Sequence, residues 1–334
     1  MSIRFAAIGL NHYHIYNMID CLLPAGAELV SFFSDEPEHI DMFSQRYPQV
    51  TLARSVAEIL EDPTIHLVTS AAVPDLRAPL GIRVMQHDKD YLCAKPAFTT
   101  LDQLAEARRV QAESGRRYVV YFGERFGNRA TIRAGELVQA GTIGRVVQTV
   151  GFGPHRLLGH VPRPGWTFQR SRFGGIINDL ASHQIDQFLY FTGSASAGIL
   201  AARTANVKFS QYPDFEDFGE LLLQSDQASG YIRVDWLTPD GLPTWGDVRL
   251  FLLGTDGYME IRKNCDVGGR DGDNHLFLVD QQGVHYLDCA NEPLPFGAQL
   301  VHDLEHRSET AVTQAHVFTV CELALKAQMQ GQSP

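Results

Sequence analysis

IRFAAIGLNHYH, residues 3–14, opens the chain with an apolar run that ends in a glycine and then turns polar. The run over residues 3–8 has the length and composition of a strand buried on both faces of a sheet. In dinucleotide-binding folds such a strand leads into a G-x-G-x-x-G loop, and the amides at the start of the next helix hold a pyrophosphate. Gly9 supplies the first glycine of that motif, whereas Asn11 and His14 stand in place of the second and third.

The physical requirement on this loop is looser than the motif, because the chain need only turn sharply enough for the helix amides to face a phosphate. Asparagine is the non-glycine residue that best tolerates left-handed backbone geometry, so we expect Asn11 to replace glycine in the turn. The large side chain of His14 is expected to push the helix away from the strand or to contact the ligand. His12 and His14 offer at most two metal ligands, with no third nearby in the sequence, so we expect no metal site.

An acid follows the second predicted strand at the position where a dinucleotide fold binds ribose. Asp35 lies 35 − 9 = 26 residues after Gly9 and is suited to accept hydrogen bonds from ribose hydroxyls. No arginine occurs at positions 36–39 to neutralise a 2′-phosphate, which favours NAD over NADP. The alternative is that Asp35 caps a turn or the next helix.

The first part of the chain alternates short apolar runs with helical patterns, which is typical of parallel strands joined by crossover helices. The predicted strands are residues 3–8, 27–33, 65–71, 91–94 and 118–122. Ser55 with Glu58, and Thr100 with Gln103, predict helix starts as capping boxes, and Gly115 predicts a helix end. We therefore predict a doubly wound sheet whose ligand crevice lies at the carboxyl ends of the strands.

The pattern changes after a predicted helix at residues 128–140, because long alternating segments then follow one another. The predicted strands there are residues 145–152, 199–209, 220–224, 230–237, 248–253, 258–262, 276–279 and 285–288. One helix at 175–191 interrupts them, and one or two helices follow from 296 to 329. The prediction is an α/β Rossmann domain at residues 1–122 and an α+β domain at 123–334 with a large open, mostly antiparallel sheet.

The composition excludes several functional classes. A net charge of −11 repels nucleic acid and anionic lipid, so neither is an expected partner. No apolar stretch approaches the ~18 residues of a membrane helix, and the first residues do not form a signal peptide, so we expect a cytoplasmic protein. The five cysteines lack metal-site spacing and are expected to be reduced thiols.

Two further motifs carry chemistry. Residues 93–96 read CAKP after a predicted strand, and residues 174–183 read GGIINDLASH at the start of the helix in the second half. Together with RF at 125–126, GTIG at 141–144 and GTDG at 254–257, they resemble the glucose-fructose oxidoreductase and inositol dehydrogenase (Gfo/Idh/MocA) family over nearly the whole chain.

This resemblance implies roles for three residues. Lys95 matches the family's lysine beside nicotinamide and substrate, Asp179 its acid and His183 its histidine. Ala94 departs from the family's glutamate, which affects how Lys95 is oriented, and the altered glycine loop affects the cofactor affinity. The candidate cofactor-binding residues, with NAD as the expected cofactor and NADP as the less favoured one, are Gly9, Leu10, Asn11, His12, His14, Asp35, Ala72 and Lys95.

The chemistry of the three catalytic candidates agrees with those roles. Asp179 and His183 stand four residues apart, which on a helix sets them on one face. A histidine titrates near neutral pH and can take a hydroxyl proton as hydride leaves the carbon, while Lys95 stabilises the developing alkoxide. We expect Lys95 and His183 to act on the same oxygen and Asp179 to orient the substrate or His183. Asp186 and Gln187 either support His183 or face solvent.

Substrate contacts are expected after the first strand of the second half. Aromatic and basic residues suit the apolar faces and the polar edges of a sugar, and His155, Trp166 and Arg170 are the candidates. Trp236 and Trp245 fit sheet packing equally well.

The leading hypothesis is an NAD(P)-dependent dehydrogenase that acts on a secondary hydroxyl of a sugar, cyclitol or sugar derivative. One alternative is a redox-neutral enzyme that keeps NAD bound and acts on a glycoside through a transient ketone. The other is a non-catalytic binding or regulatory protein on the same scaffold. By resemblance, a homodimer or homotetramer is expected to form through the sheet of the second half.

Overall fold

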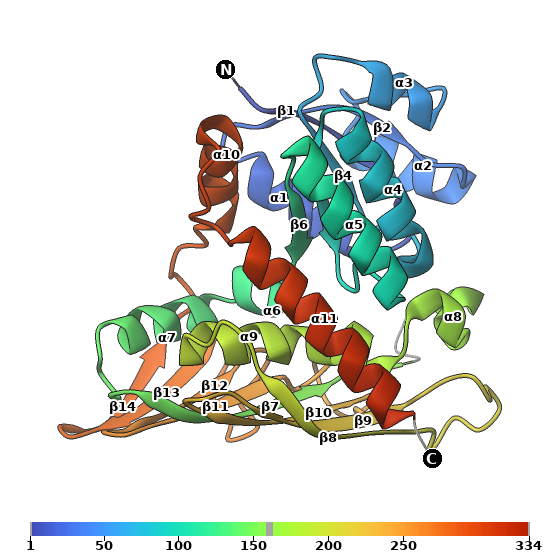
Figure 1. Cartoon of the computed structure of the whole chain (residues 1–334). Coiled ribbons are helices and arrows are strands. Elements are labelled where there is room, and N and C mark those ends of the chain that lie inside the picture. The colour runs from blue at the N-terminus through green and yellow to red at the C-terminus, as the bar shows by residue number, and fades with distance from the viewer. Residues whose placement is uncertain (1, 158–162, 333–334) are drawn as a thin grey trace. The chain divides into compact units, whose positions relative to one another are not determined.

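A computed structural model describes residues 2–157 and 163–332 of the chain. These residues form two compact units (Figure 1). The first comprises the chain up to Tyr121 together with Pro295–Phe318, and the second comprises Phe122–Leu294 together with the residues from Thr319 onward. The predicted domains change at residue 122, but the structure groups the late segment with the first unit.

The first unit is built on a six-stranded parallel sheet with strand order β3-β2-β1-β4-β5-β6. This order is that of the doubly wound dinucleotide-binding fold, so the predicted Rossmann architecture is confirmed. Its elements are β1 (Arg4–Ile8), α1 (His14–Leu22), β2 (Glu28–Phe33), α2 (Pro37–Arg46), β3 (Thr51–Leu52), α3 (Val56–Glu61), β4 (Leu67–Ser70), α4 (Pro74–Gln86), β5 (Asp90–Ala94), α5 (Leu101–Ser114), β6 (Tyr118–Tyr121) and α10 (Phe296–His306).

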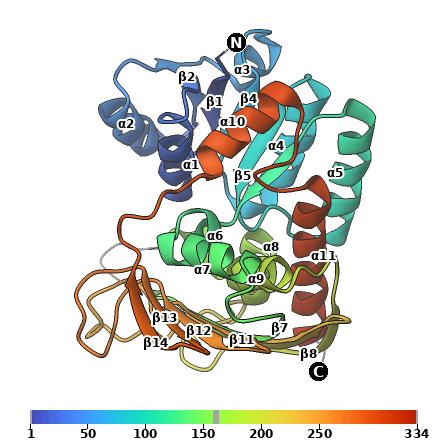
Figure 2. The same cartoon turned by 90° about the vertical axis from the view of Figure 1, so that its left-hand side faces the viewer.

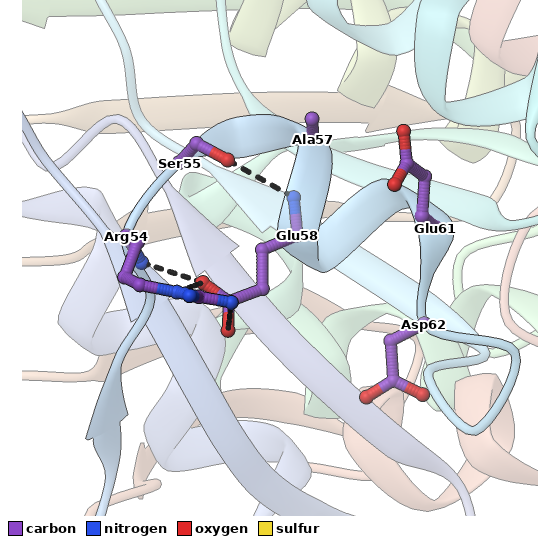
Figure 3. Close-up of a pocket in the computed structure, with 6 residues that line it drawn as sticks. All are labelled: Arg54, Ser55, Ala57, Glu58, Glu61 and Asp62. Carbon is purple, nitrogen blue, oxygen red and sulfur yellow. Dashed lines mark hydrogen bonds and ion pairs between the residues drawn. The ribbon is translucent and has the colours of Figure 1, made fainter.

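The predicted helix caps are present in this unit. Ser55 Oγ accepts a hydrogen bond of 3.2 Å from Glu58 N at the start of α3, as Figure 3 shows. Thr100 Oγ1 accepts one of 3.2 Å from the Gln103 amide at the start of α5. Gly115 ends α5 with φ +64°, a conformation that glycine adopts at little cost.

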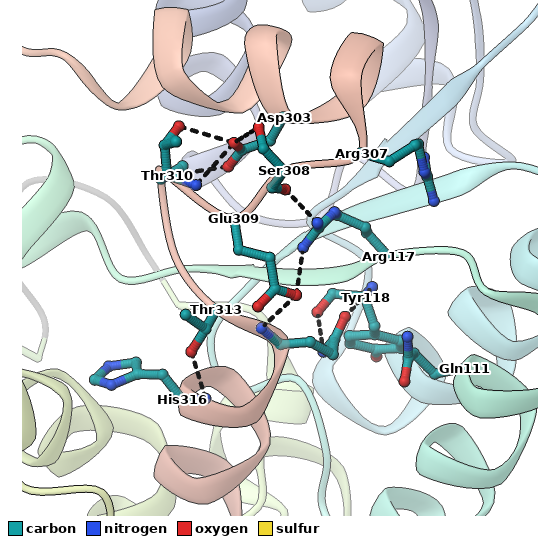
Figure 4. Close-up of polar contacts among 12 residues, drawn as sticks. Gln111, Arg117, Tyr118, Asp303, Arg307, Ser308, Glu309, Thr310, Thr313 and His316 are labelled. Atoms are coloured by element: carbon teal, nitrogen blue, oxygen red, sulfur yellow. Dashed lines mark hydrogen bonds and ion pairs between the residues drawn. The ribbon is translucent and has the colours of Figure 1, made fainter.

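Residues 307–314 return along the edge strand β6, and this contact was not visible in the sequence (Figure 4). Gln314 accepts a 2.9 Å hydrogen bond from Tyr118 N and donates one of 2.9 Å to Tyr118 O, so its amide imitates a neighbouring strand. Arg117 donates to Glu309 Oε1 at 2.8 Å and to the Ser308 carbonyl. An edge that would otherwise expose unpaired backbone groups is thereby covered.

The second unit is built on an eight-stranded sheet with order β14-β13-β12-β11-β7-β10-β9-β8. Only the central β7–β10 pair is parallel, which confirms the predicted large, mostly antiparallel sheet. The elements outside the first unit are α6 (Gly123–Phe126), α7 (Arg129–Gln139), β7 (Val146–Pro154), η1 (Gly165–Phe168), α8 (Arg170–Phe173), η2 (Ile177–Ala181), α9 (Ser182–Thr192), β8 (Gly198–Ala205), β9 (Phe218–Gln224), β10 (Ser229–Asp235), β11 (Arg249–Gly254), β12 (Tyr258–Arg262), β13 (His275–Asp280) and β14 (Gly283–Asp288). Helix α11 (Gln314–Gly331) starts in the first unit and continues in the second.

Among the residues that the structure describes, helices pack against one face of this sheet and none covers the other. Helices α7 and α9 lie along the same face of the sheet (Figure 2). Leu250, Met259 and Leu276 point to that side and join a buried core that includes Ala130 and Phe191. Along each strand the side chains alternate with residues that point to the helix-free face.

The sequence analysis did not predict the short elements β3, α6, η1 and α8, and two predicted elements have other bounds. The strand expected at 199–209 ends at Ala205, because the Asp217 carboxylate accepts hydrogen bonds from the amides of residues 207–209 and draws them out of the ladder. The helix expected at 175–191 starts two residues later, because Gly175 has φ +90°, and its first turn is the π-helical η2. Of the helices formed by the described residues, none has the length and hydropathy to cross a membrane.

Candidate functional site

The loop after β1 packs directly on the loop after β4. Gly9 has φ +75°, and a Cβ built on it would lie 2.5 Å from Ala72 Cβ, a distance that side chains do not reach. The Gly9 carbonyl also accepts a 3.0 Å hydrogen bond from the Ala71 amide. Glycine is therefore required at position 9 both by the backbone angle and by the close approach.

The turn does not use Asn11 as predicted. In residues 2–157 and 163–332, positive φ outside glycine occurs at Asp88, Asn274 and Arg307, so the expected left-handed geometry of Asn11 is wrong. Gly9 alone supplies the left-handed residue, which frees the Asn11 side chain for another contact. Its Nδ2 donates a 2.5 Å hydrogen bond to Glu36 Oε1 and thereby ties the loop after β1 to the loop after β2.

The two histidines of the loop pack against each other at the start of α1. Their ring centroids lie 4.2 Å apart, and His12 Nδ1 accepts a 3.2 Å hydrogen bond from the His14 amide. Helix α1 is not displaced from the sheet, since Ile15 and Met18 are fully buried. Contact between His14 and a ligand stays a prediction. Across the described parts of the chain, no group of three or more His, Cys, Asp or Glu side chains is arranged to hold a metal ion.

The acids after β2 have different surroundings. Asp35 is exposed, and the residue that precedes α2 is Glu36, so Asp35 does not cap this helix as the alternative reading had it. The Glu36 carboxylate contacts Asn11, as described above, and His39 Nδ1 at 3.2 Å. Sequence reasoning missed Glu36, although an acid next to the candidate ribose-binding position was the available signal.

Lys95 follows β5 and is 6% exposed, with a cis peptide bond to Pro96. Arg77 of α4 holds the backbone of this segment, because its Nη1 donates a 2.5 Å hydrogen bond to the Lys95 carbonyl. Arg77 was also missed by sequence reasoning. Its signal was a charged residue in the crossover segment, where the helix has to pack against a sheet.

The acid and histidine of the second unit lie at a change of helix type. Asp179 lies in the π-helical turn η2, where its amide donates a 2.9 Å hydrogen bond to the Gly175 carbonyl. His183 lies in the first turn of α9 and is 3% exposed, with Phe122 nearly perpendicular at 6.5 Å between ring centroids. The prediction that Asp179 and His183 share one helix face assumed a continuous α-helix, whereas a π turn has more residues per turn. Such turns occur frequently at functional sites.

A buried polar cluster supports the backbone of His183. Gln187 Nε2 donates to the His183 carbonyl at 2.9 Å, and Lys263 Nζ donates to Gln187 Oε1 at 2.5 Å. Lys263 also donates to the Glu124 carbonyl at 2.8 Å, and Gln184 Nε2 donates to Glu124 Oε2 at 2.5 Å. Burial lowers the pKa of the Lys263 ammonium, and the Glu124 carboxylate opposes that shift.

Both polar neighbours of His183 along α9 are therefore buried rather than solvent-facing. Asp186 is fully buried and accepts two hydrogen bonds of 2.7 Å from Arg125, and Gln187 bonds to the His183 backbone. The sequence left solvent exposure open as an alternative for these residues, and the structure excludes it.

An aromatic and basic cluster lies at the ends of β7 and β10. The His155 ring lies 5.3 Å from Trp236 and 4.6 Å from Trp245. Arg163, which sequence reasoning did not select, lies 5.0 Å above the Trp236 ring and donates to the Leu157 carbonyl at 2.9 Å. Burial lowers the pKa of Arg163, while the Asp179 carboxylate raises it.

The other two substrate candidates have different partners. Trp166 is partly buried in the short helix η1. Arg170 is half-exposed and forms a 3.5 Å ion pair with Glu216, which also accepts a 3.0 Å hydrogen bond from Ile176 N. Arg170 is thus linked to the start of the π turn rather than to the aromatic cluster of His155.

Two surface pockets of the first unit lie away from all these residues. One pocket of about 490 Å³ is formed around α3 and includes the Arg54–Glu58 pair, as Figure 3 shows. A second pocket of about 490 Å³ includes Lys89 and Arg307. Neither contains a candidate cofactor-binding or catalytic residue.

Comparison with known proteins places this geometry in a family. Residues 3–122 match the family model described as the oxidoreductase family, NAD-binding Rossmann fold, and residues 131–260 match the GFO/IDH/MocA C-terminal domain. A protein described as an oxidoreductase from Erwinia carotovora atroseptica has a solved structure that is 44% identical, with a TM-score of 0.96 over 98% of both chains. The chain belongs to the Gfo/Idh/MocA family.

More distant Gfo/Idh/MocA relatives carry descriptive names. Levoglucosan dehydrogenase from Pseudarthrobacter phenanthrenivorans is 29% identical over 141 residues, which are 42% of this chain and 36% of that protein. The curated relatives are thus matched over only part of their length. A structure of levoglucosan dehydrogenase with NADH and levoglucosan superposes with a TM-score of 0.80 at 18% identity, covering 99% of this chain and 97% of that one. This likeness concerns the fold.

Family membership confirms the predicted family, two-part fold and oxidoreductase class. The Gfo/Idh/MocA chain departs from the family's Glu-Lys-Pro pattern at Ala94 and from the glycine loop at Asn11 and His14. The roles of the individual site residues stay predictions.

Proposed function

We propose that this chain is an NAD-dependent oxidoreductase that interconverts a secondary hydroxyl and a ketone on an uncharged sugar or cyclitol. The observation that carries the proposal is that a Gfo/Idh/MocA chain keeps the lysine and proline of one motif, with Lys95 after β5, and both residues of the other, with Asp179 in η2 and His183 at the start of α9. A histidine and a lysine are side chains that can take up the proton of a hydroxyl and stabilise the charge that develops on its oxygen.

The loop after β1 fits a dinucleotide despite its missing glycines. Gly9 keeps the left-handed turn and the close approach to Ala72, and α1 starts five residues later with its first amides directed out of the helix. NAD, when bound, supplies the carbon that accepts the hydride. Asp35 and Glu36 favour NAD over NADP, because two acids repel a 2′-phosphate.

The protein residues have separate roles in the reaction. In the direction of oxidation, His183 takes the hydroxyl proton as the carbon–hydrogen bond breaks, which leaves a ketone. The Lys95 ammonium stabilises the negative charge that develops on the oxygen. Asp179 orients the substrate by accepting a hydrogen bond from a neighbouring hydroxyl.

An uncharged polyol is favoured over a sugar acid or phosphate by the residues around Asp179. A carboxylate that accepts from a hydroxyl repels an anionic group at the same place. Aromatic rings such as Trp236 suit the apolar faces of sugar rings. His155 is proposed as a further contact, and Trp166 and Arg170 as peripheral ones.

Turnover with NAD and a panel of neutral sugars, anhydrosugars and inositols tests the proposal, with NADH absorbance as the readout. We expect NADH to accumulate with at least one of these compounds, and NADPH to accumulate more slowly when NADP replaces NAD. Consumption of a glycoside without NADH accumulation supports instead the redox-neutral enzyme with bound NAD. Absence of NAD and NADP binding by calorimetry contradicts both and leaves a binding or regulatory protein.

We further propose that two copies of the chain associate through the helix-free face of the second unit's sheet. Two cross-strand rows on that face carry large apolar side chains. One row begins with Val284, Val279, Tyr258 and Leu253 and continues with the polar Gln148 and Ser229. The next is Tyr286, Phe277, Glu260, Phe251, Val150, Tyr231 and Leu222. Large exposed apolar patches on such a sheet mark association surfaces.

A further inference from the structure

We propose that Arg77 is a positioning residue. It holds the Lys95 segment and the Ala72 segment together at the edge of the sheet that faces the nicotinamide in the proposed function. The inference rests on the proposed function for its catalytic consequence. Its structural part concerns the first unit alone. Arg77 lies in α4 and does not itself touch the reacting atoms.

The guanidinium of Arg77 bonds to two loops at once. Its Nε donates to the Ala72 carbonyl after β4 at 2.6 Å. Its Nη1 donates to the carbonyls of Lys95 at 2.5 Å, Pro96 at 3.1 Å and Ala94 at 3.2 Å after β5. The residue is 1% exposed, so these bonds are made away from bulk solvent, where hydrogen bonds to a charged donor are strongest.

These two loops follow neighbouring parallel strands at the edge where ligands bind in doubly wound folds. The Ala72 segment also touches the loop after β1, because Gly9 approaches Ala72 too closely to carry a side chain. Arg77 thus connects the phosphate loop, through Ala72, with the lysine that faces the substrate. A shift of the Lys95 carbonyl would move the whole lysine side chain.

Only arginine can make this set of bonds. Its planar fork carries five N–H groups in fixed directions, whereas a lysine ammonium is a single point on a flexible stem. Arginine also stays charged at every physiological pH. An Arg77→Lys variant therefore keeps the buried charge but loses the simultaneous contact with Ala72 and Lys95.

The expected effect of Arg77→Lys is local loosening with loss of catalytic rate. We expect faster amide exchange in segments 71–73 and 94–97 and weaker NADH binding. With a substrate found in the panel above, kcat should fall by about 100-fold while KM changes little, since a displacement of about 1 Å at a reacting group costs on that order. Arg83→Lys, on the exposed end of the same helix, is the matched control and should behave as the wild type.

Hydrogen-exchange mass spectrometry of the full chain, with NADH titration by fluorescence, tests the inference. Faster exchange confined to the two segments in Arg77→Lys supports it. Unchanged exchange there overturns it, as does uniformly faster exchange throughout the first unit, which indicates a merely structural role. Arg77→Gln provides a second variant if the lysine variant fails to fold. Failure of the wild type to bind NADH contradicts the proposed function but leaves the exchange result able to decide the positioning role.

Discussion

At the scale of single residues, His183 is the group on which the proposed chemistry depends most. Replacing it by alanine removes the proton acceptor but leaves the first unit and its nucleotide loop intact. We expect His183→Ala to reduce turnover by about 10²–10⁴-fold, the usual contribution of a general base, with little change in the NAD dissociation constant. Steady-state kinetics and calorimetry measure the two quantities.

The matched control is His302→Ala, which removes an exposed imidazole from α10. It should leave both quantities at the wild-type values. Wild-type turnover by the His183 variant would remove the histidine from the mechanism.

Gly9→Ala tests the phosphate loop. The substitution places a side chain at φ +75° and 2.5 Å from Ala72 Cβ. The backbone angle alone costs about 1–2 kcal/mol, and the contact with Ala72 adds to that cost and shifts the loop. We expect lower stability and weaker NAD binding, measured by thermal unfolding and calorimetry.

Gly115→Ala separates the two causes, because Gly115 has φ +64° with nothing within 4 Å of the added Cβ. It should lose stability by the angle cost alone and bind NAD normally. Equal effects of the two substitutions on NAD binding would show that the close approach of Gly9 to Ala72 has no part in the site.

The sequence allowed us to select the residues that belong to recognisable functional motifs. Gly9, Lys95, Asp179 and His183 belong to motifs whose spacing can be read along the chain. Arg77, Arg163 and Lys263 act through partners that are distant in sequence, such as Lys95 for Arg77. A charged residue in a crossover segment can be noticed in the sequence, but the sequence does not show which residues it contacts. Asn11 was misjudged because its backbone preference was considered without its side-chain partner, Glu36.

At the scale of elements, the turn after α10 depends on one carboxylate. Asp303 Oδ1 accepts hydrogen bonds from Ser308 Oγ at 2.7 Å and from Thr310 N at 2.8 Å, and its Oδ2 accepts one from Ala311 N at 2.8 Å (Figure 4). Burial opposes ionisation of this carboxyl, but the hydrogen bonds from Ala311 and Thr310 outweigh it and hold its pKa below the ordinary value of 3.8.

This shift predicts a pH dependence of stability. Because the folded-state pKa is the lower one, the stabilisation is fully present above 3.8 and is lost as the pH falls through the folded value. We expect Asp303→Asn to lower the free energy of unfolding near neutral pH and to flatten its decline toward about pH 3, as measured by urea unfolding. Asp41→Asn, at an exposed position of α2, should leave the profile unchanged. A parallel decline in Asp303→Asn and wild type would refute this role.

Elements with regular periodicity were predicted within a few residues. Apolar runs predicted the strands of both sheets except the two-residue β3, and the caps at Ser55 and Thr100 predicted two helix starts. The π turn at Ile177–Ala181 was not predicted, because a single turn with more residues hardly alters the apolar pattern of a helix. The early end of β8 depends on Asp217, which lies beyond the predicted strand.

At the scale of the whole molecule, the helix-free sheet face should determine the assembly. Leu253 and Tyr258 are cross-strand partners on it and are 46% and 50% exposed. Placing lysines at both positions puts like charges within the proposed contact. We expect the double variant Leu253→Lys with Tyr258→Lys to sediment as a smaller species than the wild type in analytical ultracentrifugation.

Val267→Lys provides the comparison, because Val267 is 59% exposed in a loop of the same unit. It should sediment as the wild type. An unchanged sedimentation coefficient in the double variant would exclude this face as the subunit contact.

The sequence predicted the two-part architecture, since the change from crossover helices to alternating strands is visible along the chain. It did not predict that residues 295–318 return to the first unit. That return depends on contacts such as Gln314 with Tyr118, which join residues 196 positions apart. Long-range pairings of this kind leave no local trace in one sequence.

The central claim is that the chain transfers hydride between a polyol and NAD. It is tested most directly with a neutral sugar or inositol from the panel that carries deuterium on its carbinol carbons, incubated with NAD and the wild-type chain. We predict NADH that contains one deuterium, as measured by mass spectrometry, and almost none with His183→Ala. Bound NAD that stays unlabelled with every member of the panel would contradict the account.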